Sequence, residues 1–263
     1  MKNYFYKIII TLLGFIFISG CKKDKIGEGV DVITVQMFQK LTANGSTLIL
    51  NCSGGNFGCT NVGIKYELKI EYDNITIVFF DAYYTSYDHC IEPGNSDAPS
   101  AVANVDLGYL PNGNYNLNIS NNNSTNHLIL IVSDSKFKIV GSNSSTVKFY
   151  LGIMESNRIP VDALWGDISY DNSNYNKMLS FFDSLDSHGC SQFVMEPGNY
   201  GVFIVNADGS IDRSSLTIRD SSVLRKYSGN ISEISDIIHT FCYPNGTLDI
   251  NFYNGKGEEA DCY

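Results

Sequence analysis

The sequence predicts a mainly β protein, with an N-terminal β-sandwich followed by a second β-rich domain that contains at least one helix. The strongest observation is residues 64–72, where apolar and charged side chains alternate with the period of a half-buried strand. Asp73-Asn74 follows as a two-residue turn signal, and the apolar run 75–80 supplies a partner strand. These segments predict a β-hairpin.

Turn signals at short intervals predict that this hairpin belongs to a sandwich. Asn44-Gly45, Asn112-Gly113 and the asparagine run 121–123 separate short apolar segments. Seven or eight short strands in about 110 residues are typical of a sandwich. The other strand candidates are residues 32–38, 47–52, 102–107, 115–119, 128–132 and 137–140.

The second half mixes helix and strand patterns. Four apolar residues between Met178 and Leu185 recur at helical spacing, and Gly189 is a stop signal, which together predict a helix over residues 174–188. Residues 231–241 are ambiguous, although the preceding Asn230 looks like a helix cap. Strands are expected over residues 146–154, 200–206, 215–219 and 247–253. We place the domain boundary in the small polar stretch 141–146, which gives a sandwich over 31–141 and a second domain over 146–263.

Residues 1–20 have the pattern of an export signal. Lys2 and Lys7 give a positive start, and residues 8–18 form an apolar run with only Thr11 and Gly14 interrupting it. That run is shorter than the ~20 apolar residues that span a bilayer. Its length is typical of a signal-peptide core.

Ile18-Ser19-Gly20-Cys21 resembles the lipobox of bacterial lipoproteins. The resemblance implies removal of residues 1–20 and attachment of a diacylglycerol to the Cys21 sulfur, followed by a fatty acid such as palmitate on its amine. The acyl chains would hold the protein on the outer membrane of the cell envelope. The Cys-Lys-Lys-Asp start is similar to lipoproteins of Bacteroidota-type bacteria, and leaves open whether the protein faces the periplasm or the cell surface. Residues 21–30 are charged and contain glycine, so we expect a flexible tether.

The chain is acidic. Its net charge is −10, and removal of Lys2 and Lys7 with the signal would lower it to −12. Nucleic acid requires a basic face and is therefore excluded as a partner. The expected partners are the membrane, through the lipid, and an envelope protein or a glycan.

Six cysteines follow Cys21, and an exported chain favours disulfides. The pair expected first is Cys52–Cys59, across a short loop. If all six were paired, at least one bridge would join the two halves. A zinc site is disfavoured because no Cys-x-x-Cys pair exists. The disulfide candidates are Cys52, Cys59, Cys90, Cys190, Cys242 and Cys262.

The segment 110–115, Leu-Pro-Asn-Gly-Asn-Tyr, resembles the tyrosine corner of immunoglobulin and fibronectin-III sandwiches. The resemblance implies that the Tyr115 hydroxyl bonds to nearby backbone. The Cys…Trp…Cys pattern of immunoglobulin domains is absent, which indicates a looser relative. The motif recurs at 195–200, where Tyr200 takes the place of Tyr115, so the second half holds either a second sandwich or a similar turn.

No recognised catalytic motif is present, so neither an enzyme nor a cofactor is expected. Asp88-His89-Cys90 contains a base and a nucleophile, but adjacent residues on a strand point to opposite faces. Two groups of oxygen-bearing side chains, which we interpret as turn caps rather than calcium ligands, lack the spacing of a calcium loop. They are Asp167, Asp171, Asn172 and Asn174, and Asn206, Asp208 and Asp212.

Trp165, Tyr170 and Tyr175 lie near the first of these polar loops, where exposed rings could stack on sugars or buried rings could fill a core. The sequence therefore predicts a membrane-anchored envelope lipoprotein that acts as a non-enzymatic binding, adhesion or structural module. A glycan-binding accessory of an outer-membrane uptake system is the alternative, and a hydrolase on a β scaffold is the least favoured.

Overall fold

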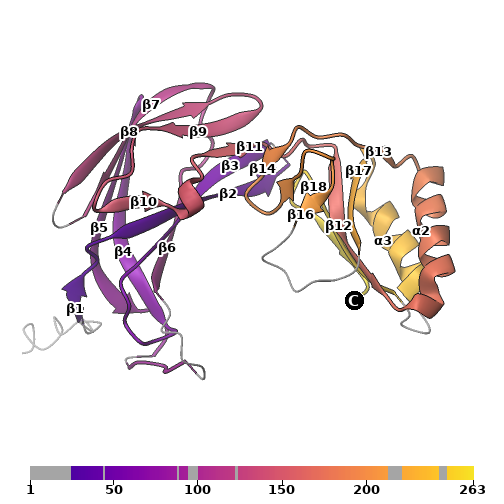
Figure 1. Cartoon of the computed structure of the whole chain (residues 1–263), viewed down its shortest axis with the longest axis horizontal. Helices are drawn as coiled ribbons and strands as arrows, with labels where there is room; N and C mark the ends of the chain where they lie inside the picture. The colour runs from indigo at the N-terminus through magenta and orange to yellow at the C-terminus, as the bar shows by residue number, and fades with distance from the viewer. Residues whose placement is uncertain are drawn as a thin grey trace, which may run out of the picture.

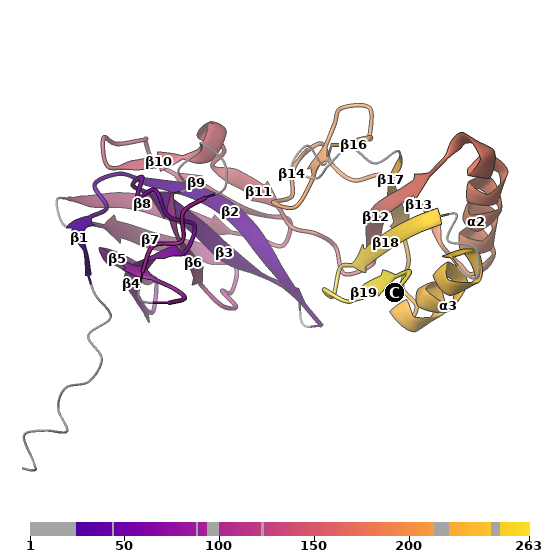
Figure 2. The same cartoon turned by 90° about the horizontal axis from the view of Figure 1, so that it is seen from below.

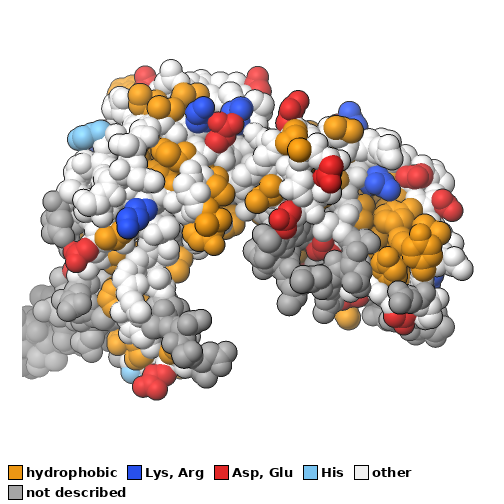
Figure 3. Space-filling model, in the orientation of Figure 1, with side chains coloured by type: hydrophobic (Ala, Val, Ile, Leu, Met, Phe, Trp, Pro, Cys, Tyr) orange, Lys and Arg blue, Asp and Glu red, His pale blue; other side chains and the backbone are white. Residues whose placement is uncertain are grey.

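The computed structural model describes residues 25–43, 45–87, 89–93, 100–121, 124–212, 221–242 and 248–263. Two lobes lie side by side, and the molecule is hollowed between them (Figures 1 and 3). The fold is mainly β, as predicted. None of the described helices is long and apolar enough to span a bilayer. The expected signal and Cys21 lie outside the described residues.

The first lobe is one eleven-stranded sheet that folds over itself around a single core (Figure 2). Its strand order is β10-β2-β3-β6-β4-β5-β7-β8-β9-β11, with β1 paired to β5. The strands are β1 (Lys25–Gly29), β2 (Ile33–Thr42), β3 (Gly45–Gly54), β4 (Val62–Glu71), β5 (Asn74–Tyr84), β6 (Ala101–Asp106), β7 (Gly113–Ser120), β8 (Thr125–Val132), β9 (Lys136–Val140), β10 (Val147–Phe149) and β11 (Glu155–Asn157).

Alternation builds this core. In β2 and β3 every second residue is buried, as a half-buried strand requires. Leu50 of β3 and Leu117 of β7 come from opposite layers and are both completely buried. Burial of each such side chain stabilises the fold by roughly 1.5–3 kcal/mol.

The predicted hairpin is confirmed as β4 and β5, but its turn is one residue earlier than expected. Glu71 pairs with Asn74, so the turn residues are Tyr72 and Asp73. Asn74 also pairs with Asn116 of β7, which draws it into the sheet and out of the turn. Tyr72 consequently adopts a left-handed φ of 52° and is 96% exposed.

Two expected boundaries need correction. Residues 25–29 of the expected flexible tether form β1, because their main chain pairs with residues 81–83 of β5. The expected domain boundary at 141–146 falls inside the first lobe, because β10 and β11 pair with β2 and β9. Ser144 explains the misleading polar stretch: its hydroxyl accepts the Val147 N–H at 2.8 Å and closes a tight turn. The chain crosses to the second lobe at residues 158–162.

The second lobe places two helices on one face of a five-stranded sheet (Figure 1). The helices are α2 (Tyr175–Ser187) and α3 (Ile231–Cys242), and short 3-10 turns lie at Tyr150–Gly152 and Asn172–Asn174. The sheet order is β13-β17-β12-β18-β19, with β12 (Ala163–Tyr170), β13 (Ser191–Gln192), β17 (Ser221–Lys226), β18 (Leu248–Asn254) and β19 (Glu259–Asp261). A small sheet of β14 (Gly198–Asn199), β15 (Ile204–Val205) and β16 (Ile211–Asp212) lies beside it.

The helix prediction for 174–188 is confirmed by α2. Met178, Phe181 and Leu185 are buried, and Gly189 follows with a φ of 87°. The ambiguous segment 231–241 is helical as α3, because the Asn230 carboxamide oxygen accepts the Ser232 N–H at 3.0 Å.

The expected Cys52–Cys59 bridge is wrong. Cys59 bonds to Cys90, and Cys242 bonds to Cys262, so neither bridge joins the two lobes. Cys52 lies on the inward face of β3 as a buried thiol, and burial raises its pKa. Cys190 is the other buried thiol, with a pKa raised to about 11, mainly by burial. Both thiols act as small apolar side chains of the core.

Both tyrosine motifs form the same turn. The Tyr115 hydroxyl donates to the Pro111 carbonyl at 2.7 Å, and the Tyr200 hydroxyl donates to the Glu196 carbonyl at 2.9 Å. The second motif leads into the two-residue strands of the small sheet, so the two motifs share a turn and not a sandwich. The immunoglobulin and fibronectin-III resemblance stays a prediction, and the parallel pairing of β5 with β7 differs from their antiparallel sheets.

Candidate functional site

A buried glutamine joins the two lobes. The Gln39 side chain of β2 donates to the Asn157 carbonyl at 2.6 Å and to the Tyr200 carbonyl at 3.0 Å. Its oxygen accepts the Ile159 N–H at 3.1 Å. Because Gln39 is 7% exposed, loss of these bonds would leave buried main-chain groups unpaired. One side chain therefore connects β2, the crossing segment and the second lobe.

Two glycines permit close approach of the lobes. A Cβ on Gly201 would lie 3.2 Å from the Phe38 Cα, and a Cβ on Gly257 would lie 2.6 Å from the Leu41 carbonyl oxygen. Both residues have left-handed φ angles, of 83° and 79°. Leu41 also packs against a small apolar cluster of the second lobe. The lobes are thus in tight main-chain contact beside Gln39.

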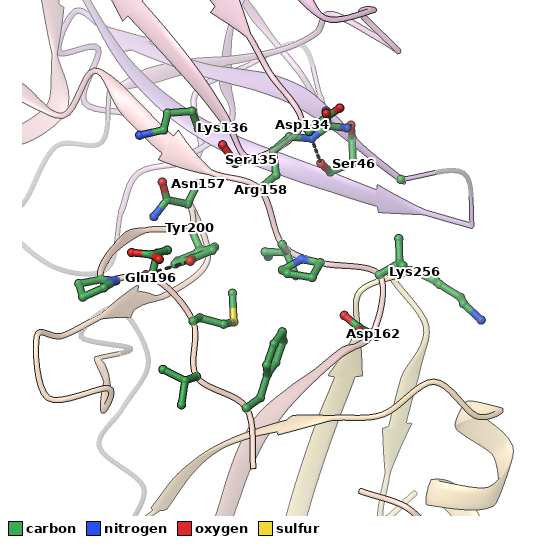
Figure 4. A pocket seen from close by; sticks show the side chains of 18 of the residues that line it. Ser46, Asp134, Ser135, Lys136, Asn157, Arg158, Asp162, Glu196, Tyr200 and Lys256 are labelled. Atoms are coloured by element: carbon green, nitrogen blue, oxygen red, sulfur yellow. Dashed lines mark hydrogen bonds between the residues drawn. The ribbon is translucent and has the colours of Figure 1, made fainter. Parts of the chain in front are cut away.

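A cleft of about 1010 Å³ lies at this junction (Figure 4). The first lobe contributes side chains from the start of β3 and from the β8–β9 turn, and the second lobe contributes residues 193–197. The labelled side chains of the two lobes face each other across the crossing segment (Figure 4). The lining residues used below are Ser46, Lys136, Glu155, Arg158, Val161 and Val194.

Arg158 is fixed in the upper wall of the cleft. Its guanidinium donates to the Ser46 hydroxyl at 3.2 Å and to the Ser133 carbonyl at 3.0 Å. The same group lies 5.1 Å from the Phe137 ring centroid, a cation–π distance. Arg158 therefore braces the start of β3 against the β8–β9 turn and supplies positive charge at the cleft.

Glu155 supplies the opposite charge beside it. The Lys136 ammonium donates to one carboxylate oxygen, and Lys138 lies 3.4 Å from the other. The Lys136 hydrogen bond is the main cause that holds the pKa of Glu155 below its ordinary value. The carboxylate is therefore ionised at neutral pH, and the rim of the cleft carries paired charges.

The second-lobe wall of the cleft is apolar around Val194. Val194 is 87% exposed, and Val161 of the crossing segment is 52% exposed, an unusual state for aliphatic residues in a cleft. Val194 lies between the half-buried Phe193 and the buried Met195, which also line the cleft. This apolar strip is exposed mainly at Val194 and lies beside a charged rim, a combination typical of a recognition surface.

Most residues that the sequence singled out lie elsewhere. Trp165, expected as a glycan contact, is 3% exposed and packs against Phe203 and Tyr253. This burial corrects the expectation of a Trp165 stacking platform, because β12 is covered on both faces. Tyr170 and Tyr175 are brought together, with ring centroids 6.3 Å apart at the start of α2.

The oxygen-rich loops serve as turn caps. The Asp171 carboxylate accepts the Asn174 N–H at 3.1 Å, and the Asp208 carboxylate accepts the Ser210 N–H at 2.9 Å. Within the described residues, no three His, Cys, Asp or Glu side chains form a metal-binding group. Cys90 is consumed by its disulfide, so it does not form a nucleophile–base pair with His89.

Neither Gln39 nor Arg158 was among the residues predicted to form a site. From the sequence alone, Gln39 looks like a polar residue near the end of a strand, and Arg158 looks like an ordinary charged residue. Their roles depend on partners more than 100 residues away in the chain. The one local signal was the repeated tyrosine motif, because its second copy supplies the Tyr200 carbonyl that Gln39 binds.

The fold and the cleft define a two-lobed, mainly β protein with a fixed groove at the lobe junction. In comparison with known proteins, no family model, curated sequence or solved structure matches the chain at a significant level.

Proposed function

We propose that the chain is a lipoprotein of the cell envelope, held in the outer membrane by acyl chains on Cys21, and that its body is a non-enzymatic binding module. The anchor depends on the charged, apolar and small-residue order of residues 2–21. The binding role depends on the cleft at the lobe junction.

The observation that carries the binding role is that the cleft is held in shape. Gln39 and the two tightly packed glycines fix the lobes against each other, so little ordering cost is left for a ligand to overcome. Its volume lies at the upper end of the range of ligand sites, about 300–1,000 Å³. An extended segment of an envelope protein, or a glycan chain, is of suitable size.

The lining favours recognition over catalysis. Neither His nor Cys is among the described residues that line the cleft. The Ser46 hydroxyl accepts from Arg158, and the Tyr200 hydroxyl donates to a main-chain carbonyl in its own turn. A ligand would meet the apolar strip around Val194 on one side and the Arg158 side chain on the other.

Mass spectrometry tests the anchor. The mature protein, extracted from membranes with detergent, should begin at Cys21 and carry the mass of a diacylglycerol plus a fatty acid. The Cys21→Ser variant should lose these masses and no longer sediment with membranes. An unmodified thiol at Cys21 in the wild type would refute the anchor.

Photocrosslinking tests the cleft. A photoreactive phenylalanine analogue at Val194, in the cleft, should capture envelope material in intact cells. The same analogue at Tyr263, which is 93% exposed at the C-terminus, is the matched control and should capture none. Equal capture at both positions, or at neither, would contradict a binding role for the cleft.

A glycan ligand outside the cleft is the second candidate, favoured by the paired rings of Tyr170 and Tyr175. Tyr175 is 50% exposed beside the Asp171 turn, an arrangement that permits stacking on a sugar. On a glycan array, binding that is lost in Tyr175→Ala and retained in Trp165→Phe would support it. Absence of binding to any glycan would remove it.

A further inference from the structure

The end of the first lobe opposite the cleft carries a platform of two loops next to β1. The first loop is residues 55–61, and the second is residues 85–93, of which the structure describes 85–87 and 89–93. The loops are joined by the Cys59–Cys90 disulfide. The Asn61 side chain, 5% exposed, accepts the Ile91 N–H at 2.8 Å and donates to the His89 carbonyl at 2.9 Å. The Thr85 N–H donates to the Asn61 carbonyl at 2.8 Å. The platform is therefore braced covalently and by a buried polar hub.

The platform projects an aromatic ring into solvent. Tyr87 is 70% exposed and has a left-handed φ of 62°, which is unfavourable for a bulky residue. The braces around Asn61 hold this conformation in place. Its ring lies 5.7 Å from the His89 ring. An exposed, rigidly held tyrosine suits the boundary between water and lipid, where such rings are enriched.

The platform contains acidic residues but no basic ones. Residues 53–61 contain no Asp, Glu, Lys or Arg, the second loop contains Asp88 and Glu92, and residues 70–135 contain neither Lys nor Arg. A surface without basic residues has no means of attracting anionic headgroups. Anionic headgroups would repel the carboxylates of Asp88 and Glu92, so zwitterionic lipid is the expected partner.

The length of chain before β1 places the membrane at this end. β1 begins at Lys25, which pairs with Tyr83 near the end of β5. The second loop of the platform follows β5 directly, so the start of β1 lies beside the platform. Four residue steps from Cys21 to Lys25 reach at most about 14 Å. β5 has 11 residues, so its far end at Asn74 lies roughly 30 Å further away. In Figures 1 and 2, β1 lies at the end of the first lobe away from the second lobe.

We propose that this platform rests on the zwitterionic lipid surface in which Cys21 is anchored, with Tyr87 at the headgroup level, so that the cleft faces away from the membrane. This inference depends on the proposed lipid anchor. It adds an interaction surface and an orientation that the anchor alone does not determine.

Tryptophan quenching in vesicles tests the orientation. The lipidated full chain is reconstituted in phosphatidylcholine vesicles with brominated acyl chains, which quench tryptophan at the membrane. Tyr87→Trp should lose most of its added emission. Tyr72→Trp is the matched control, because Tyr72 is also an exposed tyrosine with a left-handed φ but lies at the other end of the sandwich. Its added emission should be unchanged.

The outcomes separate the inference from the anchor. Protein that floats with the vesicles but shows no quenching at residue 87, or equal quenching at 87 and 72, keeps the anchor and overturns the platform, as expected if the loops bind a protein instead. Protein that does not float refutes the anchor on which the orientation depends. Trp165 in the second lobe reports correct folding in every variant.

Discussion

In the first lobe, the Tyr115 turn belongs entirely to its own sandwich, whereas the Tyr200 turn of the second lobe presents its main-chain carbonyl to Gln39 of the first. The local sequence determines the turn in both places. What the turn then does depends on what packs against it. The difference shows that a repeated motif predicts local geometry without predicting a repeated domain.

The two lobes also differ in how their hydrophobic cores are built. The first lobe buries one continuous cluster between layers of a single folded sheet, and needs no helix. The second lobe buries one cluster beneath α2 and α3 and a separate one near the junction. Stability of the second lobe should therefore depend on its helices, and stability of the junction on a few polar and glycine contacts.

The largest loss of stability is expected from a substitution in the core beneath the helices of the second lobe. Phe181 of α2 is completely buried against Phe241 and Phe252. Phe181→Ala should destabilise the second lobe by about 3–5 kcal/mol. Denaturation followed by Trp165 fluorescence should show an earlier transition, while the matched Phe79→Ala change in the first lobe should affect that transition less. Equal shifts would mean that the lobes unfold as one unit.

The next largest loss of stability is expected from a substitution at the junction of the lobes. Gln39→Leu leaves the carbonyls of Asn157 and Tyr200 and the Ile159 N–H without their partner, at a cost of about 2–4 kcal/mol. Urea denaturation should show the transitions of the two lobes further apart than in the wild type. The exposed Gln192, changed to Leu, is the control and should leave the curve unaltered.

A pair of glycines provides a second test of the close contact between the lobes. Gly257 and Gly209 have nearly equal left-handed φ angles, of 79° and 82°, but only Gly257 packs against the other lobe. Substitution by alanine should destabilise the protein at either position by roughly 1 kcal/mol through backbone strain. Gly257→Ala should be the more destabilising variant, because its Cβ would meet the Leu41 carbonyl. Equal melting temperatures for the two variants would contradict close lobe contact.

The smallest effect concerns the rim. Since the folded-state pKa of Glu155 is depressed, its ion pair contributes fully above the ordinary pKa of 4.5 and is lost as pH falls through the folded value. Solvent exposure keeps this contribution below about 1 kcal/mol. Glu155→Gln should therefore lower stability slightly at pH 7 and not at pH 3. Unfolding curves at both pH values provide the check.

Local patterns were sufficient for much of the fold. The β4–β5 hairpin and α2 follow from alternation and helical spacing, because both depend on neighbours within a few residues. The β1 strand and the continuation of the first sheet through β10 and β11 were not predicted, because pairing partners such as Ile33 and Val147 are far apart in sequence. The Cys59–Cys90 bridge was missed for the same reason. Of the candidate site, only the Tyr200 turn had a local signal.

The distance between the lobes tests the central claim most directly. Spin labels can be attached to non-natural residues that replace Tyr72 in the first lobe and Tyr175 in the second. Pulsed electron paramagnetic resonance should then give a single narrow distribution of the distance between the labels. Gln39→Leu should broaden it. A wild-type distribution as broad as that of Gln39→Leu would contradict a cleft that is preformed at the lobe junction.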